Sequence, residues 1–261
     1  MQQLKKSIQK MVDNIVDILN GQIKSIYLYG SCVLNDFKLG WSDIDILVLT
    51  KDSLTEDASN KLLTLRQQLL EKDPQNLYYR SFEGAILSFD SFVYNKRDKV
   101  VYWGTKGEKI KDTYSLDSFS TKELLENGEL LYGEDVRRFF TVPTFEDLKN
   151  DIRYHYGTIR EHARTTGRNF YSFGWFLDIS RCLYTLQTGK IIAKTLAGEW
   201  ALEHKLCPNP EVLEKVLEIR KNALEYKQKP ETFDYAETLG PTVQKYADVL
   251  ERALTSGHNT I

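Results

Sequence analysis

Two aspartates at the start of an apolar run, Asp43 and Asp45, constrain this chain more than any other feature. Side chains in a β-strand alternate between the two faces, so residues two apart share a face. Both carboxylates are therefore expected to project from one face, together with Leu47. Two neighbouring carboxylates repel each other unless a cation lies between them. A hard divalent ion with oxygen ligands, Mg²⁺ carrying the phosphates of a nucleotide, fits that position.

A Gly-Ser pair precedes the aspartates and supplies a site for phosphate. Gly30 has no Cβ, which allows backbone to approach a phosphate closely, and Ser31 adds a hydroxyl and free amide groups. Ser42, directly before the aspartates, is predicted either to bind a phosphate or to cap the loop.

Gly-Ser followed about a dozen residues later by Asp-x-Asp resembles the signature of the polymerase-β-like nucleotidyltransferase superfamily. The resemblance implies nucleotidyl transfer from a nucleoside triphosphate, with ATP as co-substrate and Mg²⁺ as cofactor. Catalysis of this kind is mostly positioning and charge neutralisation.

Composition limits the partners. The formal net charge is −2 and both signs of charge are interspersed, so nucleic acid is not expected as a partner. The start of the chain has no apolar signal core, and no run approaches the ~20 apolar residues of a membrane span, so no membrane partner is expected either. Three widely spaced cysteines fit reduced thiols, which predicts a cytoplasmic protein. Oligomeric state stays open.

The first half of the chain alternates helical and strand patterns. Apolar residues recur at helical spacing over 3–19 and 57–70, and β-prone runs cover 26–30, 44–50, 78–92 and 100–103. The second half changes character, with helical patterns over 122–131, 145–164, 170–188, 192–206, 210–228 and 241–255. The prediction is an α+β protein, with a mixed-sheet nucleotidyltransferase domain over 1–130 and a helical bundle over 131–261.

A third acid is needed, either as a further metal ligand or as the base that takes the proton of the acceptor hydroxyl. Glu83 is the best candidate because it begins the strand Glu-Gly-Ala-Ile-Leu-Ser-Phe within the run 78–92, and Gly84 beside it is expected to leave room for substrate. Asp90, at the end of the same run, is the weaker rival.

Residues 177–202, LDISRCLYTLQTGKIIAKTLAGEWAL, resemble the C-terminal domain of bacterial aminoglycoside adenylyltransferases, which modify streptomycin and spectinomycin. The resemblance implies that Arg181 and Lys194 contact ATP phosphates. The resemblance also aligns Glu83 with the residue that acts as the catalytic base in the family.

The acceptor is less well defined. The family has an acidic segment before this helix, whereas residues 166–175 here are aromatic, and Tyr171 falls where the family has a drug-binding Asp. Two acids could substitute and three aromatic residues could stack on a ring; these candidates are Glu161, Asp178, Trp103, Tyr171 and Trp175.

Three functions therefore remain open. The first is transfer of AMP to a hydroxyl of a small acceptor, foremost an aminoglycoside. The second keeps the chemistry but uses another small molecule or a protein side chain. The third is a non-catalytic nucleotide-binding protein, although such a protein has no need of the base Glu83.

Overall fold

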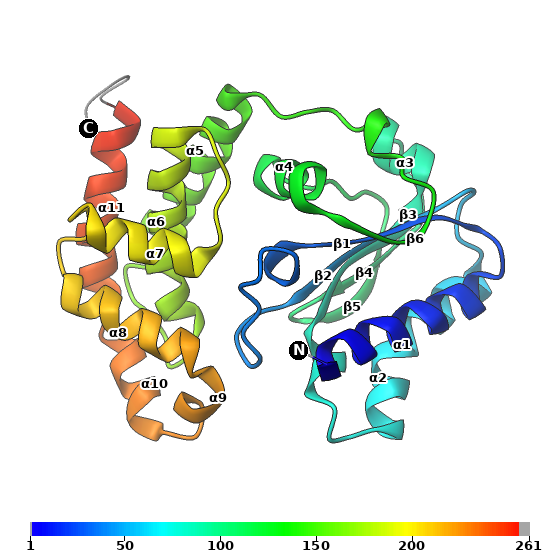
Figure 1. The fold of residues 1–261 in the computed structure, drawn as a ribbon, viewed down its shortest axis with the longest axis horizontal. Helices are drawn as coiled ribbons and strands as arrows, with labels where there is room; N and C mark the ends of the chain where they lie inside the picture. The colour runs from blue at the N-terminus through cyan, green and yellow to red at the C-terminus, as the bar shows by residue number, and fades with distance from the viewer. Residues whose placement is uncertain (1, 256–261) are drawn as a thin grey trace. The chain divides into compact units, whose positions relative to one another are not determined.

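The computed structural model describes residues 2–255, which form two compact units (Figure 1). Of the described residues, 2–37 and 42–142 form the first unit, and 38–41 and 143–255 form the second. The boundary lies later than the predicted 130/131, because a strand at Glu129–Gly133 pairs with the sheet of the first unit and keeps that segment there. The predicted α+β class, with a mixed sheet followed by helices, is confirmed.

The first unit is built on one six-stranded sheet with the order β5-β4-β3-β2-β1-β6. Only β2 and β3 run parallel; the other neighbours are antiparallel. Its elements are α1 (Gln2–Leu19), β1 (Ile23–Tyr29), η1 (Gly30–Cys32), β2 (Ile44–Thr50), α2 (Glu56–Lys72), η2 (Leu77–Ser81), β3 (Phe82–Ser88), α3 (Phe89–Tyr94), β4 (Val100–Gly104), β5 (Gly107–Lys111), α4 (Ser118–Asn127), β6 (Glu129–Gly133) and η3 (Arg137–Phe139).

The sheet separates two apolar clusters. Helices α1 and α2 cover one face, where Ile44, Ile46 and Val48 of β2 are buried. Helices α3 and α4 lie over the other face, where Leu47 and Leu49 are buried (Figure 1). The alternation expected for β2 is therefore confirmed, and Asp45 shares the face of Leu47.

Two elements predicted within the first unit differ from the structure. The run 78–92 is three elements, because β3 ends at Ser88, whose hydroxyl accepts a hydrogen bond from the Ser91 backbone and caps α3. The predicted helix 122–131 stops at Asn127, and the residues after Gly128 extend as β6 and pair with β1.

The second unit is helical. Its helices are α5 (Phe145–His162), α6 (Tyr171–Thr188), α7 (Lys194–Glu203), α8 (Pro210–Lys221), α9 (Ala223–Tyr226), α10 (Pro230–Glu237) and α11 (Gly240–Thr255). The predicted helix 210–228 is broken at Asn222, whose φ and ψ of −123° and 36° are not helical. No helix within residues 2–255 is long and apolar enough to cross a membrane.

The short segment 38–41 belongs to the second unit although it lies between β1 and β2 in sequence. Trp41 packs edge-on against Phe170, with ring centroids 5.6 Å apart, and against Phe173 at 6.5 Å. The buried guanidinium of Arg220 lies over the indole of Trp41, 5.4 Å from its ring centroid.

Candidate active site

Asp45 and Glu83 are direct neighbours on adjacent strands. In the parallel pairing of β2 with β3, Asp45 is aligned with Glu83, just as Leu47 is aligned with Ala85. Ala85 and Leu87 are buried in the cluster that also holds Leu47, so Glu83 projects from the same face as Asp45. Glu83 therefore lies beside Asp45, the second aspartate of the pair, as expected from the sequence.

The turn after β1 holds the backbone against Asp45. Gly30 has a φ of +75°, a conformation that L side chains rarely adopt. A Cβ at Gly30 would overlap Oδ2 of Asp45 and lie 2.8 Å from its Cγ. A glycine is required here for both reasons, and the aspartate carboxylate lies directly against the turn.

Ser31 and Ser42, the two serines predicted to contact phosphate, lie in different surroundings. The hydroxyl of Ser31 donates a hydrogen bond to the carbonyl oxygen of Asp43, 3.3 Å away, and ties the turn to the residue before β2. Ser42 has only 8% of its surface exposed, so it is the predicted phosphate contact that is least open to a ligand.

Gly84 does not serve the purpose expected of it. Its φ is +141°, and a Cβ there would overlap the carbonyl oxygen of Ile46 on β2. The missing side chain therefore makes room for the neighbouring strand, not for substrate. Close approach of β2 and β3 at this point keeps Asp45 and Glu83 side by side.

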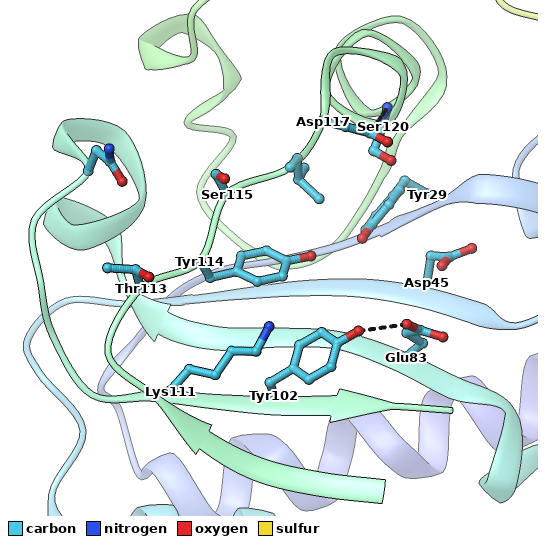
Figure 2. A pocket seen from close by; sticks show the side chains of 12 residues that line it. Tyr29, Asp45, Glu83, Tyr102, Lys111, Thr113, Tyr114, Ser115, Asp117 and Ser120 are labelled. Atoms are coloured by element: carbon cyan, nitrogen blue, oxygen red, sulfur yellow. Dashed lines mark hydrogen bonds between the residues drawn. The ribbon is translucent and has the colours of Figure 1, made fainter. Parts of the chain in front are cut away.

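A pocket of about 670 Å³ opens beside these carboxylates (Figure 2). Its wall includes Asp45 and Glu83, and Tyr102 from β4 donates a hydrogen bond of 2.8 Å to Oε1 of Glu83. The lining residues are Tyr29, Asp45, Glu83, Asn95, Tyr102, Lys111, Thr113, Tyr114, Ser115, Leu116, Asp117 and Ser120.

Acidic groups and burial keep the neighbouring weak acids protonated. Burial, followed by the charge of Asp45, raises the pKa of the Cys32 thiol to about 12. Burial also raises the pKa of Tyr114 to about 12, with Asp45 and Glu83 adding to the effect. The Cys32 thiol and the Tyr114 hydroxyl are therefore neutral near pH 7.

The acids do not form a closed metal cage. Within residues 2–255, no group of three or more His, Cys, Asp or Glu side chains is placed to hold a metal ion. Mg²⁺, however, usually takes one or two carboxylates and completes its shell with water and substrate phosphates. Two aspartate side chains next to an open glycine turn fit that donor set.

Trp103 is buried and cannot contact an acceptor, so the prediction that it stacks on an acceptor ring is wrong. It is 1% exposed, and its indole Nε1 donates a hydrogen bond of 3.0 Å to the carbonyl oxygen of Leu62 in the core below α2. Its neighbour Tyr102 points to the opposite face, toward Glu83. The alternation of 100–103 could have indicated that only one of these two aromatic residues faces the site, but not which one.

Arg181 and Lys194 gather around one acid of the second unit. Lys194 begins α7, and its Nζ lies 2.8 Å from Oδ1 of Asp178 on α6. Burial raises the pKa of Asp178, but the charge and hydrogen bond of Lys194, then the charges of Arg181 and His155, hold it below its ordinary value. The second unit thus brings both predicted phosphate-binding cations to the same acid.

The remaining acceptor candidates lie on α5 and α6. Tyr171, Trp175 and Asp178 are spaced by four and three residues, so they share one face of α6, with Tyr171 66% exposed. Glu161 lies in the last turn of α5, where its carboxylate is 3.8 Å from Nε2 of His162.

Comparison with known families agrees with both units. Residues 8–110 match the nucleotidyltransferase domain family, and residues 139–250 match the aminoglycoside adenylyltransferase C-terminal domain family. The chain is therefore a nucleotidyltransferase, and Asp43, Asp45 and Glu83 fall within the matched catalytic domain. With its second unit also matched, it belongs to the aminoglycoside adenylyltransferase-like group of these enzymes.

Individual relatives are distant. A spectinomycin 9-adenylyltransferase of Campylobacter jejuni is 25% identical over 214 residues, which cover 76% of this chain and 78% of that protein. A spectinomycin 9-adenylyltransferase of Staphylococcus aureus (strain Mu50) is 23% identical over 198 residues, covering 72% and 74%. The fold is similar to the crystal structure of a spectinomycin adenyltransferase from Enterococcus faecialis with ATP and spectinomycin. The TM-score is 0.68 at 18% identity, covering 95% of this chain and 99% of that one.

Proposed function

We propose that this enzyme transfers AMP from ATP to a hydroxyl group of a small acceptor and releases pyrophosphate. The acceptor we favour is spectinomycin or a related aminoglycoside, which would make the protein an antibiotic-resistance enzyme of the cytoplasm. The observation that carries the proposal is the cross-strand pairing of Asp45 with Glu83 beside the Gly30 turn.

In this proposal the turn and the two aspartates hold the nucleotide. The backbone amides of the Gly30 turn and the hydroxyl of Ser31 bind the β- and γ-phosphates. Asp43 and Asp45 bind Mg²⁺, which would neutralise charge on the phosphates during transfer. Ser42 stays a weaker candidate because it is buried.

Glu83 acts as the general base. The acceptor hydroxyl oxygen forms a bond to the α-phosphorus while the bond from that phosphorus to the bridging oxygen breaks, so pyrophosphate leaves with the electron pair. The hydroxyl proton passes to the carboxylate of Glu83. This role is consistent with the position of Glu83 on the pocket wall next to Asp45.

Arg181 and Lys194 bind phosphate oxygens from the second unit. A cation at the first residue of a helix is opposed by the helix dipole, so Lys194 contributes little to the stability of α7. An anion is favoured in the same position, because the dipole and the two cations all attract it.

Tyr171, Trp175 and Asp178 are proposed to contact the acceptor. Their common face on α6 offers two aromatic surfaces for a ring and one carboxylate for a cationic group. The aromatic character of 166–175 keeps a second acceptor class open, a hydroxyl on another small molecule or on a protein side chain.

The test is transfer of label from α-labelled ATP in the presence of Mg²⁺. Spectinomycin, streptomycin, other aminoglycosides and unrelated hydroxylated antibiotics should be offered in parallel, and the products identified by mass spectrometry. An acceptor gaining one AMP, with equimolar pyrophosphate, supports the proposal. ATP binding without transfer to any acceptor would favour a non-catalytic protein, and label on protein would favour the second acceptor class.

A further inference from the structure

The carboxylate of Glu83 has a partner that the site described so far does not require. The Tyr102 hydroxyl donates a hydrogen bond of 2.8 Å to Oε1 of Glu83, from the neighbouring strand (Figure 2). A hydrogen bond to an ionised acceptor is shorter and stronger than a neutral one. Among the described residues, the other oxygen, Oε2, has only the Thr105 hydroxyl at 3.5 Å, the outer limit of a hydrogen bond. Oε1 is therefore held, and Oε2 is restrained far less.

The ring of Tyr102 reaches Glu83 because Gly104 leaves room for it. In the pairing of β3 with β4, Tyr102 is aligned with Ala85, two residues from Glu83 on the same face. A Cβ at Gly104 would lie 2.5 Å from Cε1 and 3.1 Å from the hydroxyl oxygen of Tyr102. The tyrosine ring thus lies over the glycine backbone, along β4, and presents its hydroxyl to the glutamate.

Two lysines and a buried arginine fix this arrangement. The Nζ of Lys111 lies 4.0 Å from the centroid of the Tyr102 ring, and the Nζ of Lys109 lies 5.6 Å from it. Arg66, which is 7% exposed, donates hydrogen bonds to the carbonyl oxygens of Phe82 and Gly104 at 2.5 and 3.2 Å. One side chain of α2 therefore holds the backbone at Phe82, directly before Glu83, and at Gly104, two residues after Tyr102.

We infer that Tyr102 is a positioning residue for Glu83, which it orients so that Oε2 faces the acceptor hydroxyl. The inference rests on the proposed role of Glu83 as the base. A glutamate has three side-chain torsions, and a free carboxylate spends most of its time away from one productive geometry. The hydroxyl remains a donor at all ordinary pH values, because burial and then the hydrogen bond to Glu83 raise the pKa of Tyr102 above 10.0.

The variant that tests this is Tyr102→Phe, which keeps the ring and removes only the donor. The expected result is a fall in kcat of about ten- to a hundredfold, the size of a lost hydrogen bond to a charged group, with an unchanged KM for ATP. The control is Tyr27→Phe, since the Tyr27 hydroxyl is also bound within this sheet, to Asp135 at 3.1 Å and to the backbone N–H of Val136 at 2.6 Å. It should lower the melting temperature and leave kcat unchanged.

Two further variants separate positioning from a general structural role. Gly104→Ala should displace the Tyr102 ring and reduce kcat to a similar extent. In a Glu83→Gln background, Tyr102→Phe should cause no additional loss, because both changes act on the same proton transfer. An equal loss with and without Glu83, a change in KM alone, or a wild-type kcat in Tyr102→Phe would each overturn the inference.

Crystal structures of the wild-type protein and of Tyr102→Phe give a readout that does not depend on the acceptor. The Glu83 carboxylate should keep one position in the wild type and several in the variant. One unchanged position in both would overturn the inference, whereas failure of the wild type to modify any acceptor would count only against the proposed function.

Discussion

Gly30 and Asp45 are in van der Waals contact, with the carboxylate of one lying where a side chain of the other would be. The aspartate therefore determines which residue can occupy position 30, in addition to the constraint from its φ of +75°. The turn proposed to bind phosphate and the strand proposed to bind the metal thus share one fixed geometry, and a change in either residue is expected to disturb both.

Gly30→Ala should therefore abolish transfer and also destabilise the fold. The positive φ alone costs about 1 kcal/mol. Gly21→Ala is the matched control, because Gly21 has a φ of +80° but nothing within 4 Å of its Cβ position. Urea unfolding should show a loss of about 1 kcal/mol for Gly21→Ala and a larger loss for Gly30→Ala, whose Cβ also overlaps the Asp45 carboxylate, while transfer assays should detect lost activity only for Gly30→Ala. Full activity in Gly30→Ala would show that the close approach of Gly30 to the Asp45 carboxylate is not needed for transfer.

Asp43→Asn and Asp45→Asn should each abolish transfer in a folded protein. Removal of one metal-binding charge is expected to cost several kcal/mol of transition-state stabilisation, or about 10³-fold or more in rate. The measurements are AMP transfer at saturating Mg²⁺ and circular dichroism. Turnover at the wild-type rate in a folded Asp45→Asn variant would remove the strand from the active site.

Glu83→Gln should bind ATP with Mg²⁺ and turn over about 10²- to 10⁴-fold more slowly. Glutamine keeps the size of the side chain and one acceptor oxygen, but cannot take up the proton. Isothermal titration calorimetry measures the first quantity and transfer kinetics the second. Lost nucleotide binding would identify Glu83 as chiefly a metal ligand, and unchanged turnover would direct attention to Asp90 or Asp178.

Arg181→Ala and Lys194→Ala should each weaken ATP binding about tenfold, the effect of one lost charge-assisted phosphate contact. Lys190→Ala is the control, since Lys190 is an exposed lysine shortly before α7 with no assigned ligand. Calorimetry with ATP compares the three. Equal affinities for all of them would exclude the second unit from nucleotide binding.

The stability contributed by Asp178 should disappear in acid. Its pKa is below the ordinary value of 3.8, because Lys194, Arg181 and His155 outweigh the effect of burial. A group with a lowered folded-state pKa stabilises the protein fully above its unfolded-state pKa and loses that contribution as pH falls through the folded-state pKa. Asp178→Asn should thus lower the free energy of unfolding at pH 7, by about 1 kcal/mol or less for this partly exposed pair.

The difference between the two proteins should begin to shrink as the pH falls to about 3.8 and should disappear only below the lowered folded-state pKa of Asp178, as followed by urea unfolding at several pH values. A constant difference across that range would show that packing, not charge, accounts for the effect of the substitution.

The shared face of Asp45 and Glu83 could be predicted from sequence because it depends on local rules. Alternation along β2 set the face of Asp45, and the same alternation along β3 set the face of Glu83. The family resemblance then brought the two strands together. None of this requires knowledge of side chains from distant elements.

The wall of the pocket could not be predicted in this way. Tyr102 faces Glu83, and Trp103 faces the core, only because of the register of β4 against β3. A shift of one residue would exchange them. Strand β6 was missed for a related reason, since five residues after Gly128 become a strand only through pairing with β1, over a hundred residues earlier in the chain.

The segment 38–41 has a consequence for dissecting the protein. The chain passes between its two units after residues 37, 41 and 142. A single cut after residue 142 would therefore not separate the units cleanly, because residues 38–41 of the second unit would stay with the first. A fragment ending at Val142 would carry Trp41 without Phe170, Phe173 and Arg220, which cover its indole. That fragment would expose the Trp41 indole to water two residues before Asp43. If it aggregated or bound nucleotide weakly, the cause would be the exposed indole, and the result would not show whether strands β2 and β3 can bind nucleotide.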